Sequence, residues 1–153
     1  ETIYEILTAL DTAEKLGIPL IPKINLLVEP RSLKPVVGHS ACDAICVSNT
    51  LPWGSLPDRI NWKKLFGSSV SPLARLGGGG LSGAPLFPLL VEWIKESQGI
   101  VTRPIIAGGG ILSKFEIIEL AHFPNVTPSI GSIAFLRPWR VRSTIEMAEM
   151  MFP

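Results

Sequence analysis

"RPIIAGGGILSKFEI" (residues 103–117) contains a strand, a turn and the start of a helix in one short stretch. Its first half is a continuous apolar run, which is typical of a parallel strand covered on both faces. Three glycines end that run. Ser113 and Glu116 then have the spacing of a capping box, which predicts a helix to about His122. The stretch therefore predicts one β–α unit of a parallel α/β fold.

The same alternation continues in both directions along the chain. Apolar runs predict three more strands, at residues 18–28 (IPLIPKINLLV), 43–50 (DAICVSNT) and 126–136 (VTPSIGSIAFL). Helical spacing predicts helices at residues 2–16, 31–40, 85–97 and 138–151. Residues 51–76 are expected to form a long segment without regular secondary structure. One helix followed by four β–α units predicts an α/β fold whose strands are parallel.

Composition limits the class of protein. The length of 153 residues fits one domain, spanning residues 1–153, and 46% hydrophobic residues allow a buried core. The net charge of +1 indicates no surface for nucleic acid, and no apolar run approaches the roughly 18 residues of a membrane span. The chain begins at Glu1 without an initiator methionine, so we expect it to be a piece of a longer protein.

The two cysteines, Cys42 and Cys46, are too few for a disulfide scaffold. They are interpreted as small buried thiols of a cytoplasmic protein. A metal site built from His39, Cys42 and Cys46 is the alternative, but no second ligand cluster accompanies it, so no metal is expected. His39 and His122 are predicted to be surface residues.

The glycine-rich stretch "GGGGLSGAPLF" (residues 77–87) comes just before a predicted helix. Gly80 and Gly83 are expected to present bare backbone to an anionic or planar ligand. Gly78 fits with them into a G-x-G-x-x-G dinucleotide pattern, but no strand leads directly into it and no acidic residue ends the next strand. A flexible linker stays open as an interpretation of residues 77–79.

Polar residues and glycines gather where the predicted strands end. Parallel α/β folds bind ligands at the carboxyl ends of their strands. These positions hold Lys23 and Asn25; Ser48, Asn49 and Thr50; Gly108, Gly109 and Gly110; and Ser129, Gly131 and Ser132. Lys23 either extends its ammonium to solvent or faces an electron-rich ligand. Asn49 and Thr50 either form a turn or hydrogen-bond a small polar substrate.

Several of these motifs, taken in order, resemble the C-terminal half of the dihydroorotate dehydrogenase family. They are "IPKINLL", "VSNT", "GGLSGAPL", "IIAGGGI" and "SIGSIAFL", and the resemblance covers nearly the whole chain. It implies half of a (β/α)₈ TIM barrel, with about four β–α units and FMN at the strand ends. The parent enzyme is then expected to oxidise dihydroorotate to orotate, in pyrimidine biosynthesis, by passing a hydride to FMN.

The resemblance also implies residue roles. Lys23 would contact the flavin ring, and Ser48 and Gly83 would line it. Asn49 and Thr50 would hold dihydroorotate or orotate. The ribityl phosphate would be bound by the remaining four residues, Gly109, Gly110, Gly131 and Ser132.

The family's catalytic base, a Cys or Ser on a loop, is expected before Glu1, and neither Cys42 nor Cys46 matches it. No catalytic residue is therefore assigned, and the isolated chain is expected to be inactive. Residues 121–132, AHFPNVTPSIGS, also lack the usual Ala-Gly-Ala. Two alternatives stay open: a related FMN barrel that acts on another pyrimidine, and a non-catalytic phosphate-binding half-barrel.

An isolated half of a barrel would leave two unpaired sheet edges and one bare sheet face. Of Ile24, Ile45, Ile106 and Ile130, those whose register turns them to that face would meet water. We therefore expect a homo-oligomer, unless residues 51–76 fold over the face.

Overall fold

A sheet of four parallel strands organises the chain in the computed structural model, which describes residues 2–152. The strands are β1 (Lys23–Ile24), β2 (Ile45–Val47), β5 (Ile105–Gly108) and β6 (Val126–Ser129). They lie side by side in this order, and each neighbouring pair is parallel. The predicted α/β fold, with the parallel sheet of a partial barrel, is confirmed.

The two faces of the sheet differ because side chains alternate along each strand. One row of register partners, Ile24, Val47 and Ala107, is buried. The neighbouring row crosses all four strands as Lys23, Cys46, Ile106 and Thr127, and its two outer members are exposed.

The register therefore decides which of the isoleucines considered from the sequence face water, apart from Ile130, which lies after the end of β6. Ile106 lies half-buried on the open face, whereas Ile24 and Ile45 are buried toward the helices. Because Lys23 and Thr127 share the open face with Ile106, that face is less apolar than expected.

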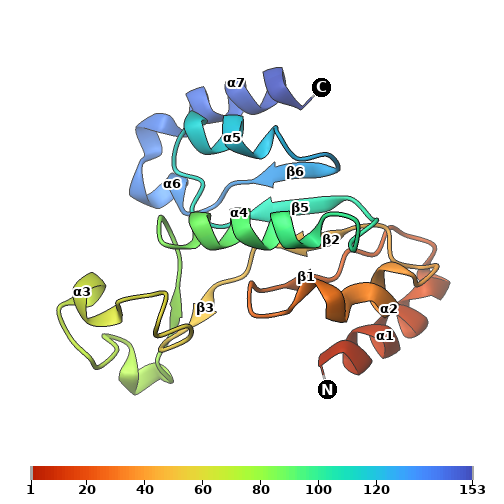
Figure 1. Cartoon of the computed structure of the whole chain (residues 1–153), viewed down its shortest axis with the longest axis horizontal. Coiled ribbons are helices and arrows are strands. Elements are labelled where there is room, and N and C mark those ends of the chain that lie inside the picture. Colours follow the sequence, from red (N-terminus) through yellow and green to blue (C-terminus); the bar gives the residue numbers. More distant parts are fainter. Residues whose placement is uncertain (1, 153) are drawn as a thin grey trace.

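Helices cover the buried face (Figure 1). They are α1 (Thr2–Ala13), α2 (Lys34–Val37), α4 (Leu86–Ser97) and α5 (Lys114–Leu120), with the 3₁₀ turns η1 (Glu14–Leu16) and η2 (Pro30–Leu33). Buried residues of these four α-helices and of the strands form one apolar cluster. The last helix, α7 (Val141–Met151), follows the turn η4 (Pro138–Arg140) and packs on α5.

Two predicted helix boundaries have clear physical causes. Gly17 ends η1 in the left-handed conformation, with φ of 63°, as expected of a helix stop. Ser113 caps α5: its hydroxyl accepts a hydrogen bond from the Phe115 N–H and donates to the Glu116 carboxylate at 2.5 Å. The expected Ser–Glu pair is present, although the carboxylate bonds the serine hydroxyl and not its backbone N–H.

Three predicted strands were too long, and the one predicted over residues 43–50 is only Ile45–Val47. Only Lys23–Ile24 of residues 18–28 is a strand, because Pro19 and Pro22 lack an N–H and the Asn25 side chain accepts from the Leu27 N–H to form a turn. Within residues 126–136, the strand ends at Ser129, and Ile133–Leu136 forms the short helix α6. Its first turn begins with a hydrogen bond from the Ala134 N–H to the Gly131 carbonyl.

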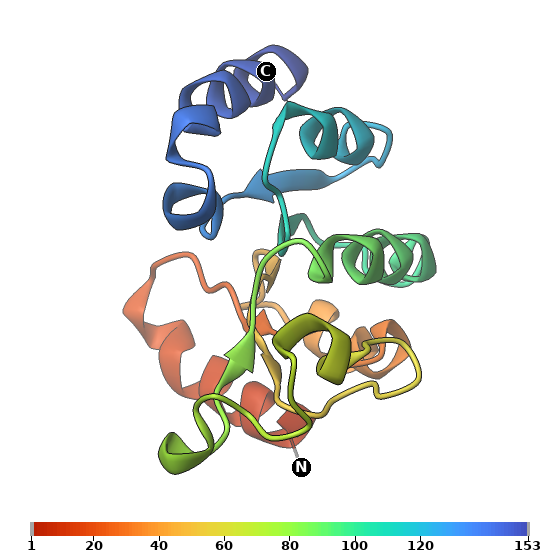
Figure 2. The same ribbon diagram turned by 90° about the vertical axis from the view of Figure 1, so that its left-hand side faces the viewer.

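Residues 51–81 have more structure than the sequence indicated. Strands β3 (Leu51–Pro52) and β4 (Gly80–Leu81) pair antiparallel, and between them lie α3 (Trp62–Phe66) and the 3₁₀ turn η3 (Ala74–Leu76). This segment, hereafter the insertion, projects beyond the carboxyl ends of the parallel strands and does not lie over the open face (Figures 1 and 2). It packs around a small core of its own, made with Leu86 of α4: Leu51, Ile60, Trp62 and Leu81.

The four consecutive glycines enter β4. Gly77, Gly78 and Gly79 have φ of 83°, 94° and 71°, which side chains rarely adopt, so they form an ordered turn and not a linker. Gly80 lies within β4, where a Cβ would overlap the Thr50 side chain. The dinucleotide interpretation is excluded, because these glycines belong to an antiparallel pair and not to a strand–helix turn.

Candidate functional site

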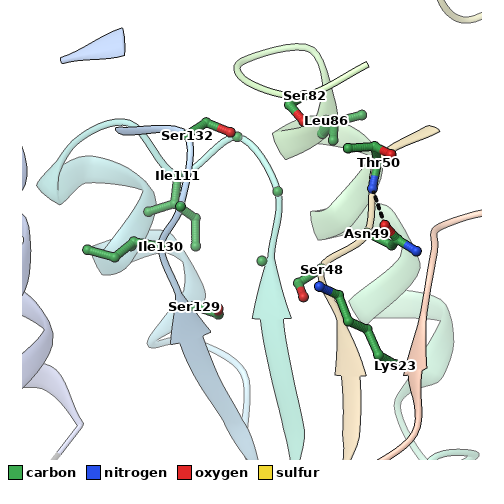
Figure 3. A pocket seen from close by; sticks show the side chains of 14 residues that line it. Lys23, Ser48, Asn49, Thr50, Ser82, Leu86, Ile111, Ser129, Ile130 and Ser132 are labelled. Atoms are coloured by element: carbon green, nitrogen blue, oxygen red, sulfur yellow. Dashed lines mark hydrogen bonds between the residues drawn. The ribbon is translucent and has the colours of Figure 1, made fainter. Parts of the chain in front are cut away.

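A cavity of about 270 Å³ lies at the carboxyl ends of the parallel strands (Figure 3). Eight of the nine residues predicted from the sequence line it: Lys23, Ser48, Asn49, Thr50, Gly109, Gly110, Gly131 and Ser132. Gly83, the ninth, is not a lining residue but lies directly behind the wall, since a Cβ on Gly110 would be 2.8 Å from the Gly83 carbonyl oxygen. Residues from all four parallel strands, or from the turns that follow them, thus meet at one cavity.

Lys23 is the only charged residue among those that line the cavity. It begins β1 on the open face, and its ammonium extends toward Ser48 (Figure 3). Within residues 2–152, no carboxylate forms an ion pair with it. The cavity therefore has one positive charge that is available to an anionic or electron-rich ligand.

Ser48 is held at the end of β2 by contacts on two sides. Its hydroxyl lies 3.0 Å from the Cys46 thiol, two residues earlier on the same face. Its Cβ packs on Gly108, where an added Cβ would come within 2.7 Å of it. Gly108 is therefore a glycine because the serine needs the space.

Asn49 and Thr50 follow at once and form a local turn. The Asn49 side-chain oxygen accepts a hydrogen bond from the Thr50 N–H at 2.9 Å. The Asn49 amide nitrogen is left as a donor without a partner in residues 2–152, as judged from the side-chain hydrogen bonds there. The two interpretations of this pair are compatible, because the turn holds the donor beside the cavity.

Two short turns form the opposite wall. Gly109 and Gly110 make a turn after β5 with φ of 134° and 74°, and Gly131 and Ser132 lie between β6 and α6. In the described part of the chain, the N–H groups of these four residues donate to no backbone acceptor. Free N–H groups beside a single ammonium suit an anion such as a phosphate.

Sequence reasoning assigned no role to several further lining residues. They are Ser82, Leu86, Gly108, Ile111, Ser129 and Ile130. Ser82 was within reach of prediction, since it belongs to the quoted motif GGLSG, and Gly108 and Ser129 were recognised as strand ends. No sequence pattern marked Leu86 and Ile111 as lining residues, because an apolar residue next to the end of a strand or helix looks the same in the sequence as an ordinary core residue.

None of the three residues weighed as metal ligands lines this cavity, although the half-buried Cys46 contacts the lining residue Ser48. Cys42 is fully buried, and burial raises the pKa of its thiol, an effect that the nearby Arg103 guanidinium partly offsets. The His39 ring is half-buried and lies 3.0 Å from an Asp11 carboxylate oxygen, whereas His122 is exposed, as predicted. Among residues 2–152, His, Cys, Asp and Glu side chains form no group of three that could hold a metal ion.

Comparison with known proteins gives relatives of one kind. The catalytic subunits of dihydroorotate dehydrogenase B (NAD(+)) from Anoxybacillus flavithermus and from a Geobacillus species are 28% and 29% identical over 122 residues, which are 80% of this chain and 35% of each relative. The Bacillus cytotoxicus subunit is 26% identical over 129 residues, 84% of this chain and 38% of the relative. No family model matches the sequence.

A solved structure gives the same result at the level of the fold. Ligand-free DHODH from Eimeria tenella matches 87% of this chain and 33% of its own, with a TM-score of 0.50 and 21% identity. The resemblance to the dihydroorotate dehydrogenase family is thereby confirmed, and the chain spans just over a third of the length of the curated relatives it matches. None of the helices in residues 2–152 is long and apolar enough to cross a membrane.

Proposed function

We propose that this chain forms the phosphate-binding side and part of the substrate side of an FMN-dependent oxidoreductase that acts on dihydroorotate. One observation carries the proposal: Lys23, the Asn49–Thr50 pair and the two glycine turns belong to four separate strands or to the turns that follow them, yet line one cavity. The relatives' names supply the substrate. The glycine turns and the ammonium supply the chemistry that a phosphorylated flavin requires.

The hydrogen-bond donors of the residues that line the cavity suit the phosphate of FMN. Unpaired N–H groups at Gly109, Gly110, Gly131 and Ser132, together with the Ser132 hydroxyl, would hold its phosphate. Gly131 fits this role further, because a Cβ there would meet no atom within 4 Å, so nothing in the fold itself requires a glycine. A bare backbone at that position is explained if a ligand approaches it closely.

The opposite wall would orient the reacting groups. Lys23 would place its positive charge beside the ring system and so favour negative charge there. Asn49, with its amide donor free, and Thr50 would hydrogen-bond the carbonyl and carboxylate groups of dihydroorotate. FMN, when bound, would supply the hydride acceptor.

The cavity also fits a site that is only part of a larger one. Its volume of about 270 Å³ lies just below the roughly 300–1,000 Å³ of complete small-molecule pockets. A chain that matches just over a third of its relatives is expected to contribute only some of the walls. We therefore expect FMN to bind weakly to this chain alone.

Two variants test the assignment of roles. Adding FMN and then orotate to the full chain, we expect Ser132→Ala to weaken FMN binding, measured by flavin fluorescence. We expect Asn49→Ala to keep FMN binding but to lose the change that orotate causes in the flavin absorption spectrum. If FMN binds to the unmodified chain and orotate leaves its spectrum unchanged, the dihydroorotate assignment is wrong. If the two variants behave alike, the division of the cavity into two sides is wrong.

A further inference from the structure

The insertion has a structured core that borders the main cavity through Leu86 alone of its members, since no residue of the insertion itself lines that cavity. Only its flanking residues, Thr50 at one end and Ser82 at the other, line that cavity. Between them, residues 51–81 form a strand pair, a short helix and a 3₁₀ turn around the buried side chains of Leu51, Ile60 and Trp62. We therefore ask whether this segment has a function of its own.

Three aromatic side chains of the insertion pack against one another. The Trp53 ring centroid lies 4.7 Å from that of Trp62 and 4.9 Å from that of Phe66, and the Trp62 and Phe66 rings are stacked at 6.2 Å. They line a cavity of about 180 Å³ whose remaining walls are Ser71, Pro72, Leu73, Gly78, Gly80 and Leu81. This second cavity, hereafter the aromatic cavity, shares no lining residue with the first.

The aromatic cavity offers almost nothing to a polar ligand. The Ser71 hydroxyl donates to the Gly78 carbonyl, and the Trp62 ring N–H donates to the Ser55 carbonyl at 3.0 Å. With those donors used inside the protein, the walls are effectively apolar. An enclosed apolar cavity of about 150 Å³ takes up a benzene-sized molecule. The aromatic cavity is thus large enough for one ring or for the end of an alkyl chain.

The surroundings of the aromatic cavity add a charge preference. Two of its wall residues, Phe66 of α3 and Leu73 just before η3, are themselves 42% and 48% exposed, so the cavity opens to solvent beside them. Residues 61–81 contain three basic residues, Lys63, Lys64 and Arg75, and no acidic one. Positive charge therefore lies on α3, which carries Phe66, and on η3, which follows Leu73, and this favours an anionic group outside the cavity.

We propose that the aromatic cavity binds an anionic amphiphile, with its apolar tail against Trp53, Trp62 and Phe66 and its acidic head in solvent near the basic residues of α3 and η3. The cavity volume limits the buried part to the end of one chain. This site goes beyond the proposed oxidoreductase function and does not depend on it, because the two cavities have separate walls.

The experiment uses the full chain and bromoundecanoate carrying bromine at the tail end, a tryptophan quencher. We expect saturable quenching, with one molecule bound per chain by calorimetry. The neutral alcohol with the same tail should bind a few-fold more weakly, because it lacks the attraction to the basic residues. Absence of saturable quenching would overturn the site, and equal affinities of acid and alcohol would overturn the anionic class.

Matched variants on one helix locate the bound molecule. Phe66→Ala removes a cavity wall and should weaken binding about tenfold, the factor that about 1.4 kcal/mol represents. Leu65→Ala is the control: Leu65 is the neighbouring residue, similarly exposed at 46%, and does not line the cavity, so binding should change less than twofold, or less than about 0.4 kcal/mol. Leu73→Trp is a second variant that should block binding by filling the cavity without removing packing. Equal effects of the two alanine variants would overturn the proposal.

An experiment with lipid vesicles distinguishes binding of a free amphiphile from binding to a membrane. The chain is mixed with vesicles of phosphatidylcholine containing phosphatidylglycerol and then sedimented. Binding of bromoundecanoate that is lost in Phe66→Ala supports the cavity, whatever the vesicle result. Sedimentation with vesicles while bromoundecanoate stays unbound would overturn it, because the apolar surface would then act without the cavity.

Discussion

Replacing Gly110 with alanine should destabilise the fold, whereas the same change at Gly131 should not, although both glycines line the main cavity. Gly110 has φ of 74°, and a Cβ there would lie 2.7 Å from the Phe87 backbone nitrogen and 2.8 Å from the Gly83 carbonyl oxygen. Both atoms belong to the backbone at the start of α4, so neither can move without shifting that helix. Gly131 has no such constraint, since an added Cβ meets nothing within 4 Å.

The magnitudes follow from these contacts. A side chain held in the left-handed region costs about 1–3 kcal/mol, and an overpacked contact adds about 1–3 kcal/mol. We therefore expect Gly110→Ala to lower the free energy of unfolding by about 2–6 kcal/mol. At about 2–4 °C per kcal/mol for a chain of this length, the melting temperature should fall by at least about 4 °C. Gly131→Ala should stay within about 0.5 kcal/mol of the unmodified chain.

Thermal and urea unfolding followed by circular dichroism measure both variants, and FMN titration follows on each. Gly131→Ala should unfold like the unmodified chain but bind FMN more weakly, because its methyl group would occupy the space left for the phosphate. The reasoning is refuted if Gly110→Ala melts within about 1 °C of the unmodified chain, or if Gly131→Ala loses as much stability as Gly110→Ala.

Three further predictions follow from other parts of the fold. Burial raises the pKa of the Cys42 thiol, so its thiolate forms only at higher pH than usual. Iodoacetamide at mildly alkaline pH should therefore alkylate Cys42 far more slowly in the folded chain than in urea. Equal alkylation rates, measured by mass spectrometry, would contradict this prediction. Ser113→Ala removes the cap of α5 and should cost about 1 kcal/mol, seen as a fall of about 2–4 °C in melting temperature, and an unchanged melting curve would show that the cap contributes nothing. The unpaired edges of β1 and β6 should lead to self-association, so light scattering at micromolar concentration should give at least twice the chain mass of 16.6 kDa, and a monomer would count against the expected homo-oligomer.

The sheet and most of the main cavity could be predicted because both depend on local patterns. Short apolar runs indicate parallel strands, and the polar residues that follow them must lie at one edge of the sheet. Lys23, Asn49 and Gly110 therefore come together without any knowledge of distant contacts. The exact strand lengths could not be predicted in the same way, because a turn such as that at Asn25 depends on one side-chain hydrogen bond.

The insertion was the largest gap in the sequence reasoning. Its residues lack periodicity, and its two strands are only two residues long each, Leu51–Pro52 and Gly80–Leu81. Contacts between Trp53, Trp62 and Phe66, which are separated along the chain, hold it together, and no local pattern signals them. The open face of the sheet is also less apolar than the sequence indicated, because the register turns Lys23 and Thr127 outward with Ile106.

Binding of FMN compared with riboflavin, which lacks the phosphate, tests the central claim most directly. The full chain is titrated with each flavin, and affinity is measured by quenching of flavin fluorescence. Hydrogen bonds to a charged group contribute about 1.5–3 kcal/mol each, and about 1.4 kcal/mol is tenfold in affinity. If Gly109, Gly110, Gly131 and Ser132 hold the phosphate, FMN should bind at least about tenfold more tightly than riboflavin, and Ser132→Ala should narrow that difference. Equal affinities for the two flavins would contradict the account.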